Sequence, residues 1–199
     1  MKALLDKISK IEHGFNHIIE AGQVILQDDR IDHFELAQRF IESTQPYQVR
    51  MLGTYLLGEL AVINKKALEL LEKTVSQDEN WRVQEMLAKA FDAYCKNKGY
   101  EKSLVKIKFW IKHKNSNIAR AVTEGLRIWT SRDFFRENPK TAIELISSNK
   151  RTESLYLRKS IGNALRDIKK KFPEEIREEI STWDKQDKKI EFILKLINK

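Results

Sequence analysis

IARAVTEGLRIW, residues 118–129, carries apolar or small side chains at its first, fourth, fifth, eighth, ninth and twelfth positions. At about 100° per residue these positions share one face of an α-helix. Three other segments align with it without gaps: VRMLGTYLLGEL (49–60), VQEMLAKAFDAY (83–94) and LRKSIGNALRDI (157–168). The starts of the four segments are 34, 35 and 39 residues apart. The repeat therefore predicts four equivalent amphipathic helices.

Each of the last three repeat helices is preceded by another segment with helical spacing of its apolar residues: KKALELLEKTV, EKSLVKIKFWIKH and KTAIELISS. Helix pairs that recur every ~35–40 residues are typical of HEAT-like α-solenoids, in which a pair buries its apolar stripe only by stacking on its neighbours. No segment of convincing length alternates with period two. We predict an all-α protein of about ten or eleven helices. The expected fold is an α-solenoid of stacked antiparallel pairs, a single curved domain over residues 1–199 with a concave basic surface.

Gly125 lies at the eighth position of this repeat, where the sister helices carry Leu56, Ala90 and Ala164. Glycine makes a helix less stable than alanine by roughly 1 kcal/mol. We expect the glycine to be kept because it lets neighbouring helices approach closely. It therefore needs no catalytic explanation.

The net charge of +8 is concentrated in one part of the chain. Residues 101–171 contain 18 Lys and Arg and 7 Asp and Glu, a balance of 18 − 7 = +11, and the remainder is slightly acidic. Such a concentration favours a polyanionic partner, either nucleic acid or an anionic membrane surface. On charge alone, a protein with a lysine-rich surface and no such partner is an equally good explanation.

Other functional classes have little support in the sequence. The single Cys95 excludes a disulfide framework and a multi-cysteine metal site. His13 and His17 have the spacing of two metal ligands, but no convincing third ligand is present, so we expect ordinary helix positions. No apolar stretch reaches the ~18 residues of a membrane span, and MKALLDKISK is a charged helix start rather than a signal peptide. We therefore expect a cytoplasmic monomer without membrane contact, metal or cofactor.

The candidate binding surface is the face opposite the apolar stripe, since the second helices of successive pairs line up along one side of a solenoid. On an arbitrary helix, a pair such as Arg120 and Glu124 would only stabilise its own helix. Basic residues that recur on three stacked helices make a track that can follow phosphates. We predict polynucleotide contacts by Lys89, Arg120, Arg127, Arg132, Arg158, Lys159, Asn163 and Arg166.

The same surface carries three acidic residues and has tryptophans near it. Carboxylates weaken phosphate binding, so Glu85, Glu124 and Asp167 are better candidates for chemistry than acids elsewhere. Tryptophan faces can hold cationic or unstacked bases. Trp81, which precedes the second repeat helix, and Trp129, which ends the third, are therefore candidate base contacts. For each of them the alternative is a place in the core.

Three stretches of the chain resemble the bacterial DNA alkylation-repair proteins of the AlkC/AlkD type: WRVQEMLAKAFDAYC, NSNIARAVTEGLRIWTSRDFFRENPKTAIELI and SLYLRKSIGNALRDIKKKFPEEI. The resemblance covers roughly residues 80–184. Its most specific part, residues 158–168, is more similar to the AlkC side. The T-E-G string of residues 123–125 corresponds to an S-E-G string of the AlkC-like pattern.

The resemblance implies an α-solenoid that holds double-stranded DNA on a basic concave surface. Active members of the family cut the N-glycosidic bond of alkylated, positively charged purines without metal or cofactor. Glu85, Glu124 and Asp167 fall on acidic positions of the family pattern, and we expect catalytic roles for them. Two alternatives remain open at this point: a DNA-binding solenoid without catalysis, and a protein–protein scaffold.

Overall fold

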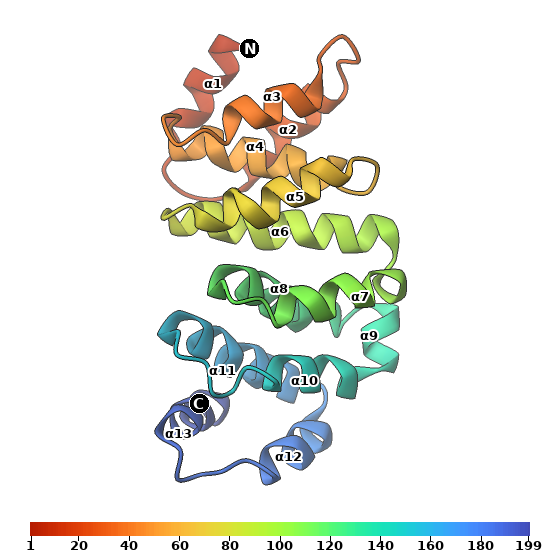
Figure 1. Ribbon diagram of the computed structural model, residues 1–199, viewed down its shortest axis with the longest axis vertical. Helices are drawn as coiled ribbons and strands as arrows, with labels where there is room; N and C mark the ends of the chain where they lie inside the picture. The colour runs from red at the N-terminus through yellow and green to blue at the C-terminus, as the bar shows by residue number, and fades with distance from the viewer. The chain divides into compact units, whose positions relative to one another are not determined.

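The computed structural model describes residues 1–199 and is entirely helical, with thirteen α-helices and one short 3₁₀-helix (Figure 1). The all-α prediction is confirmed, and the expected number of about ten or eleven helices is too low. Short helices such as α9 account for the difference. Contacts within the chain divide it into two compact units, residues 1–98 and 99–199. Each unit is described by itself.

The first unit is built around one central helix, α4 (Tyr47–Leu60), which contacts every other α-helix of the unit. Its side chains are buried on almost every face, as expected for a helix surrounded by others. A Cβ atom on Gly58 would lie 2.5 Å from the Cα atom of Ala90, so this glycine allows a close approach of α4 to α6. The surrounding elements are α1 (Lys2–Ser9), α2 (Asn16–Leu26), α3 (His33–Phe40), α5 (Lys65–Lys73), η1 (Val75–Gln77) and α6 (Trp81–Lys98).

The second unit stacks antiparallel helix pairs. In Figure 1, α7 and α10 form one layer, and α8 and α11 lie side by side in a second layer. α13 packs against α11 on the side away from α8. The bounds are α7 (Tyr100–Ile111), α8 (Ser116–Trp129), α9 (Asp133–Glu137), α10 (Pro139–Ser147), α11 (Leu155–Lys169), α12 (Pro173–Ser181) and α13 (Lys188–Ile197).

The predicted repeat helices are confirmed as α4, α6, α8 and α11, and the helices that precede the last three are α5, α7 and α10. Local capping explains where two of them begin. The Asn115 Oδ1 atom accepts a hydrogen bond from the backbone N–H of Asn117 at 2.9 Å, at the start of α8. The Ser154 Oγ atom accepts from the N–H of Leu157 at 3.2 Å, at the start of α11. Such caps satisfy N–H groups that have no partner within the helix.

Gly125 makes room for a side chain of its own helix. A Cβ atom at this position would lie 2.4 Å from the Cζ2 atom of Trp129, one turn further along α8. The Trp129 ring is stacked on Phe135 at 5.7 Å between centroids and lies 5.2 Å from the Tyr100 ring. The closest constraint on this glycine is therefore the Trp129 ring of its own helix, and its predicted place in the core is confirmed.

Gly125→Ala should destabilise the protein by about 1–3 kcal/mol, because the added methyl group forces the Trp129 ring to move and this outweighs the gain in helix propensity. Chemical denaturation measures the change. In a Trp129→Phe background the smaller ring leaves space, so Gly125→Ala should become neutral or stabilising there. The same loss in both backgrounds would contradict this explanation.

Candidate functional site

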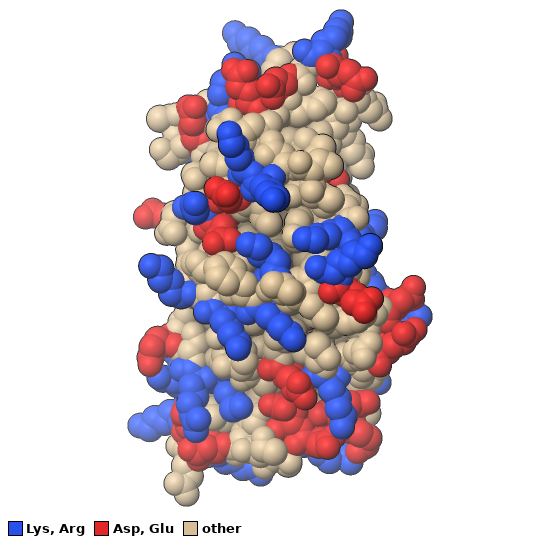
Figure 2. All heavy atoms as spheres, turned by 45° about the vertical axis from the view of Figure 1, so that its right-hand side comes forward, with Lys and Arg blue, Asp and Glu red and all other residues tan.

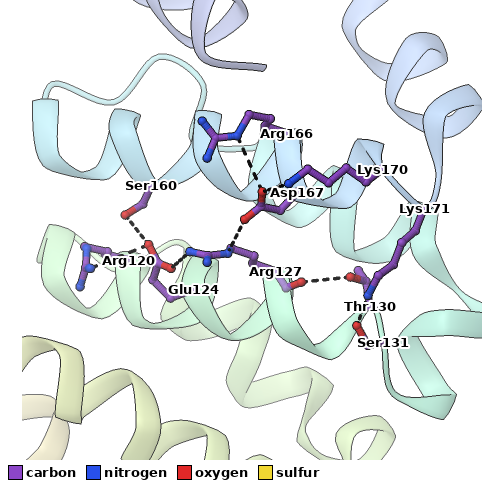
Figure 3. A network of polar contacts seen from close by, with 10 residues as sticks. All are labelled: Arg120, Glu124, Arg127, Thr130, Ser131, Ser160, Arg166, Asp167, Lys170 and Lys171. Atoms are coloured by element: carbon purple, nitrogen blue, oxygen red, sulfur yellow. Dashed lines mark hydrogen bonds and ion pairs between the residues drawn. The ribbon is translucent and has the colours of Figure 1, made fainter. Parts of the chain in front are cut away.

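A polar network joins the facing sides of α8 and α11 (Figure 3). Glu124 lies in its inner part. Its Oε2 atom accepts a hydrogen bond from Nη1 of Arg127 at 3.0 Å, and its Oε1 atom accepts one from the Ser160 hydroxyl at 2.7 Å. Nη2 of Arg120 lies 3.8 Å from the same Oε1 atom. Both oxygens of Glu124 are therefore engaged, one of them by the neighbouring helix.

Asp167 of α11 occupies the outer part of the network. Nε of Arg127 forms an ion pair with its Oδ2 atom at 2.9 Å, and Nζ of Lys170 donates to its Oδ1 atom at 3.1 Å. Nε of Arg166 lies 3.7 Å from Oδ1. Arg127 thus uses different nitrogens of one guanidinium to connect both carboxylates, which matches the fork geometry of this side chain.

The network has more positive than negative charge. The cations are Arg120, Arg127, Arg166 and Lys170, and the carboxylates are Glu124 and Asp167, which gives 4 − 2 = +2. Burial alone would raise the pKa of Asp167. The hydrogen bond from Lys170 and the charges of Arg127, Lys170 and Arg166 outweigh it, so the pKa lies below its ordinary value of 3.8. Asp167 is therefore ionised at neutral pH.

Exposure rises along the network from Arg120 to Lys170. Arg120 is only 4% exposed, and its guanidinium lies 4.2 Å from the centre of the Tyr156 ring. The side chain of Asp167 is 26% exposed and that of Lys170 is 70% exposed. The prediction of an Arg120 contact with phosphate is wrong for this structure, because the side chain is buried on a tyrosine ring.

The other predicted contacts have different surroundings. Lys159 is exposed, and Asn163 is half-buried. The half-buried Arg158 lies 5.8 Å from the ring of Phe192 in α13 and donates to the backbone oxygen of Glu153. Arg132 precedes α9, with its guanidinium 5.4 Å from the Tyr100 ring. Unlike Arg120, these four side chains keep surface that an approaching phosphate can reach.

Glu85 and Lys89 lie on α6 in the first unit. Glu85 is half-buried, while Lys89 is exposed and has its Nζ atom 5.2 Å from the Phe15 ring. The structure brings Glu124 and Asp167 together, as expected, with Arg127 between them. The catalytic roles of all three carboxylates stay predictions.

The two tryptophans proposed as base contacts differ completely in exposure. Trp81 is 51% exposed. Trp129 is 0% exposed and belongs to the aromatic core with Phe135 and Tyr100. The prediction that Trp129 contacts a base is wrong, and its alternative, a core position, is correct.

Three residues of the network were missed from the sequence. Ser160 occupies a repeat position that holds the buried apolar residues Leu52, Met86 and Ala121 in the sister helices, so nothing marked it as the partner of Glu124. Lys170 and Tyr156 lie just outside the aligned repeat. The spacing from Asp167 to Lys170, three residues on one helical face, was the one available signal.

Acidic side chains gather elsewhere in the second unit. Figure 2 shows a group of them in the lower part of the molecule. A hollow between α10 and α12 is lined by four glutamates, and Nζ of Lys140 there forms an ion pair with Glu178 at 2.7 Å. This acidic region is distinct from the cationic network between α8 and α11. The glutamates are Glu144, Glu175, Glu178 and Glu179.

Two further findings concern membrane spans and metal ions. None of the helices is both long and apolar enough to cross a membrane. No group of three or more His, Cys, Asp or Glu side chains is arranged to hold a metal ion. His17 lies in α2, as expected, but His13 lies in the loop before it, so the expected helix position was wrong for His13.

Acidification should remove the contribution of Asp167 to stability. Because its pKa is lowered in the folded protein, the stabilisation is fully present above the unfolded value of 3.8 and is lost as the pH falls below it. The free energy of unfolding of the wild type should therefore fall more steeply below about pH 4 than that of Asp167→Asn. Parallel pH profiles of the two proteins would contradict this.

Arg127→Gln should lower the free energy of unfolding by about 1–2 kcal/mol, because it leaves two carboxylates without their shared partner. The matched control is Arg136→Gln, which removes an exposed pair with Asp133. Its effect should stay within about 0.5 kcal/mol. Equal losses in the two variants would show that the bridge contributes no more than a surface pair.

Comparison with known proteins identifies relatives over the whole chain. AlkD2 from Streptococcus mutans is 44% identical, with a TM-score of 0.94 over 100% of this chain and 95% of that one. The smu.31 protein of S. mutans UA159 is 42% identical, with a TM-score of 0.86 over 100% and 98%. These likenesses confirm the predicted HEAT-like solenoid fold. The first carries the AlkD name and not the AlkC name that the sequence of residues 158–168 led us to expect.

A further relative is matched over only part of its length. The uncharacterized protein YhaZ of Bacillus subtilis is 32% identical over 87 residues, which are 42% of this chain and 24% of YhaZ. The sequence of residues 21–194 matches the family described as DNA alkylation repair enzymes. This match covers most of the chain and agrees with the resemblance found from the repeat helices. The chain therefore belongs to the DNA alkylation repair enzyme family.

Proposed function

We propose that this protein binds double-stranded DNA as a monomer and hydrolyses the N-glycosidic bond of alkylated, cationic bases. The observation that carries the proposal is Asp167, a partly exposed carboxylate that is held ionised among Arg127, Arg166 and Lys170. The surrounding cations suit DNA phosphates, and the carboxylate suits a cationic transition state.

Phosphate binding is assigned to the exposed cations of α8 and α11. Arg127, Arg166 and Lys170 contact Asp167 and retain exposed surface, and Lys159 lies on the same repeat face of α11. The proposed contacts also include Lys89, Arg132, Arg158 and Asn163. Each phosphate that is neutralised releases condensed counterions, so binding should weaken steeply with salt.

The proposed reaction needs little acid catalysis. A base alkylated on a ring nitrogen carries a positive charge and becomes neutral when it leaves with the electrons of its bond to C1′. The sugar then has oxocarbenium character, which a nearby carboxylate stabilises, and water forms the new bond to C1′ and loses a proton to solvent. Because Asp167 stays ionised, it acts as an anion and not as a proton donor.

The other carboxylates receive different roles. Glu124 is engaged by Arg127 and Ser160, so its proposed role is to position Arg127 rather than to meet the sugar. Glu85 of α6 is half-buried and remains the second candidate for contact with the reacting sugar.

A second candidate function is DNA binding without catalysis. It is favoured by the engagement of the Glu124 and Asp167 oxygens by cationic side chains, which is also the arrangement of a purely structural network. Measurement of base release distinguishes the two functions.

Lys159→Ala should weaken duplex binding and reduce the steepness of its salt dependence by about one counterion, because Lys159 is exposed and contributes little to stability. Fluorescence anisotropy with a labelled duplex, measured between low and moderate salt, tests this. Lys65→Ala, an exposed lysine on α5, is the matched control and should leave the slope unchanged. Absence of duplex binding by the wild type at low salt would contradict both candidate functions.

Asp167→Asn should abolish release of methylated purines from alkylated duplex DNA and leave duplex affinity within about threefold. Glu85→Gln should have the same effect if it meets the sugar. Asp133→Asn, which changes an exposed acid of α9, is the control and should release bases like the wild type. Chromatography of released bases is the measurement. If the wild type binds duplex but releases no base, the protein binds DNA without cleaving it.

A further inference from the structure

The first unit exposes a stack of aromatic and cationic side chains where α4 and α6 begin. The Arg82 guanidinium lies 4.5 Å from the centre of the Trp81 ring and 5.2 Å from that of the Tyr47 ring. Although Arg82 covers part of it, Trp81 keeps 51% of its surface exposed. A large aromatic side chain that is half-exposed and already aligned with a planar cation is a candidate stacking surface.

Several contacts hold this stack in place. The Oδ1 atom of Asn80 accepts the backbone N–H of Arg82 at 3.0 Å, at the start of α6. Nη2 of Arg82 lies 3.3 Å from Nδ1 of His13, and a guanidinium can only donate, so Nδ1 is the acceptor. The Tyr47 hydroxyl donates to the backbone oxygen of Glu12 at 3.2 Å. The loop before α2 therefore holds both Arg82 and Tyr47, and the planar groups need little reordering to receive a ligand.

We infer that Trp81, Arg82 and Tyr47 form a binding site for an unpaired, uncharged nucleobase together with its phosphate. The inference rests on the proposed DNA binding and specifies which base the exposed tryptophan takes. Every base has a π face that stacks on indole, and paired bases in a duplex do not offer that face. The site therefore favours bulged or single-stranded positions over fully paired DNA.

The charge of Arg82 decides between a neutral and a cationic base. Its guanidinium lies over the Trp81 ring and already uses the attraction of that ring for a cation. A cationic base stacked on the exposed part of the indole would be repelled by Arg82, whereas a neutral base would not. A phosphate of the same strand would be attracted to Arg82, and the exposed Lys89 lies two turns further along α6 to receive another.

Tryptophan fluorescence tests the site directly. Trp110 and Trp129 are fully buried and Trp183 is nearly so, which leaves Trp81 as the tryptophan that a ligand can reach. The probes are a duplex with one bulged thymine, the same duplex fully paired, and the same duplex with a bulged N7-methylguanine. The bulged thymine should quench the fluorescence, and the paired duplex should quench it much less.

Trp81→Ala should lower affinity for the bulged-thymine duplex by roughly 5- to 150-fold and leave affinity for the paired duplex unchanged. Trp81→Phe should restore part of the loss. Phe109→Ala, which removes another exposed aromatic from α7, is the matched control and should change neither affinity. Arg82→Gln should raise the affinity for bulged N7-methylguanine relative to bulged thymine.

Three outcomes would overturn the inference. The first is equal binding of bulged and paired duplexes by wild type and Trp81→Ala, in which case DNA binding itself would still stand. The second is a Trp81→Ala loss confined to the N7-methylguanine probe, which would assign the ring to a cationic base. The third is absence of binding to every probe at low salt, which would remove the proposed DNA binding as well.

Discussion

The packing of α8 against α11 in the second unit depends on how the negative charge of Glu124 is neutralised between these two helices. A carboxylate in this position is stable only if cations and hydrogen-bond donors satisfy it. Arg127 on its own helix and Ser160 on the next provide these contacts, so the register of α8 against α11 is restricted by a polar requirement as well as by apolar packing. In that register Nε of Arg127 faces Asp167. The surface carboxylate therefore owes its position to the inner one.

The sequence predicted the helices, their pairing and the polar face, because helical periodicity reports which side of each helix is buried. It placed Glu124, Arg127 and Asp167 on that face correctly. It did not predict the hydrogen bond to Ser160, since that depends on the offset between α8 and α11. The two repeats start 39 residues apart instead of 34 or 35, and the offset between their helices cannot be read from the periodicity of either helix alone.

Arg120 and Trp129 show where the periodic argument fails. Arg120 lies on the polar face, but its guanidinium stacks on the ring of Tyr156 at the start of α11. A guanidinium can stack on an aromatic ring even when little of the guanidinium reaches water. Trp129 lies at the apolar edge near the end of its helix, where an exposed position would also be possible. The missing side chain of Gly125 provides the space that takes it into the core. Both outcomes depend on residues outside the polar face.

The two carboxylates of this network, Glu124 and Asp167, differ in their surroundings. The side chain of Glu124 is 17% exposed and accepts a hydrogen bond from Ser160 of the facing helix as well as from Arg127, so a change there affects packing first. Asp167 is held by side chains that also reach solvent. Under the proposed function, incoming phosphates compete with Asp167 for Arg166 and Lys170, and each cation drawn to the DNA leaves the carboxylate less neutralised. Asp167 would then be most available to a developing positive charge only when DNA is bound, which confines the chemistry to the complex.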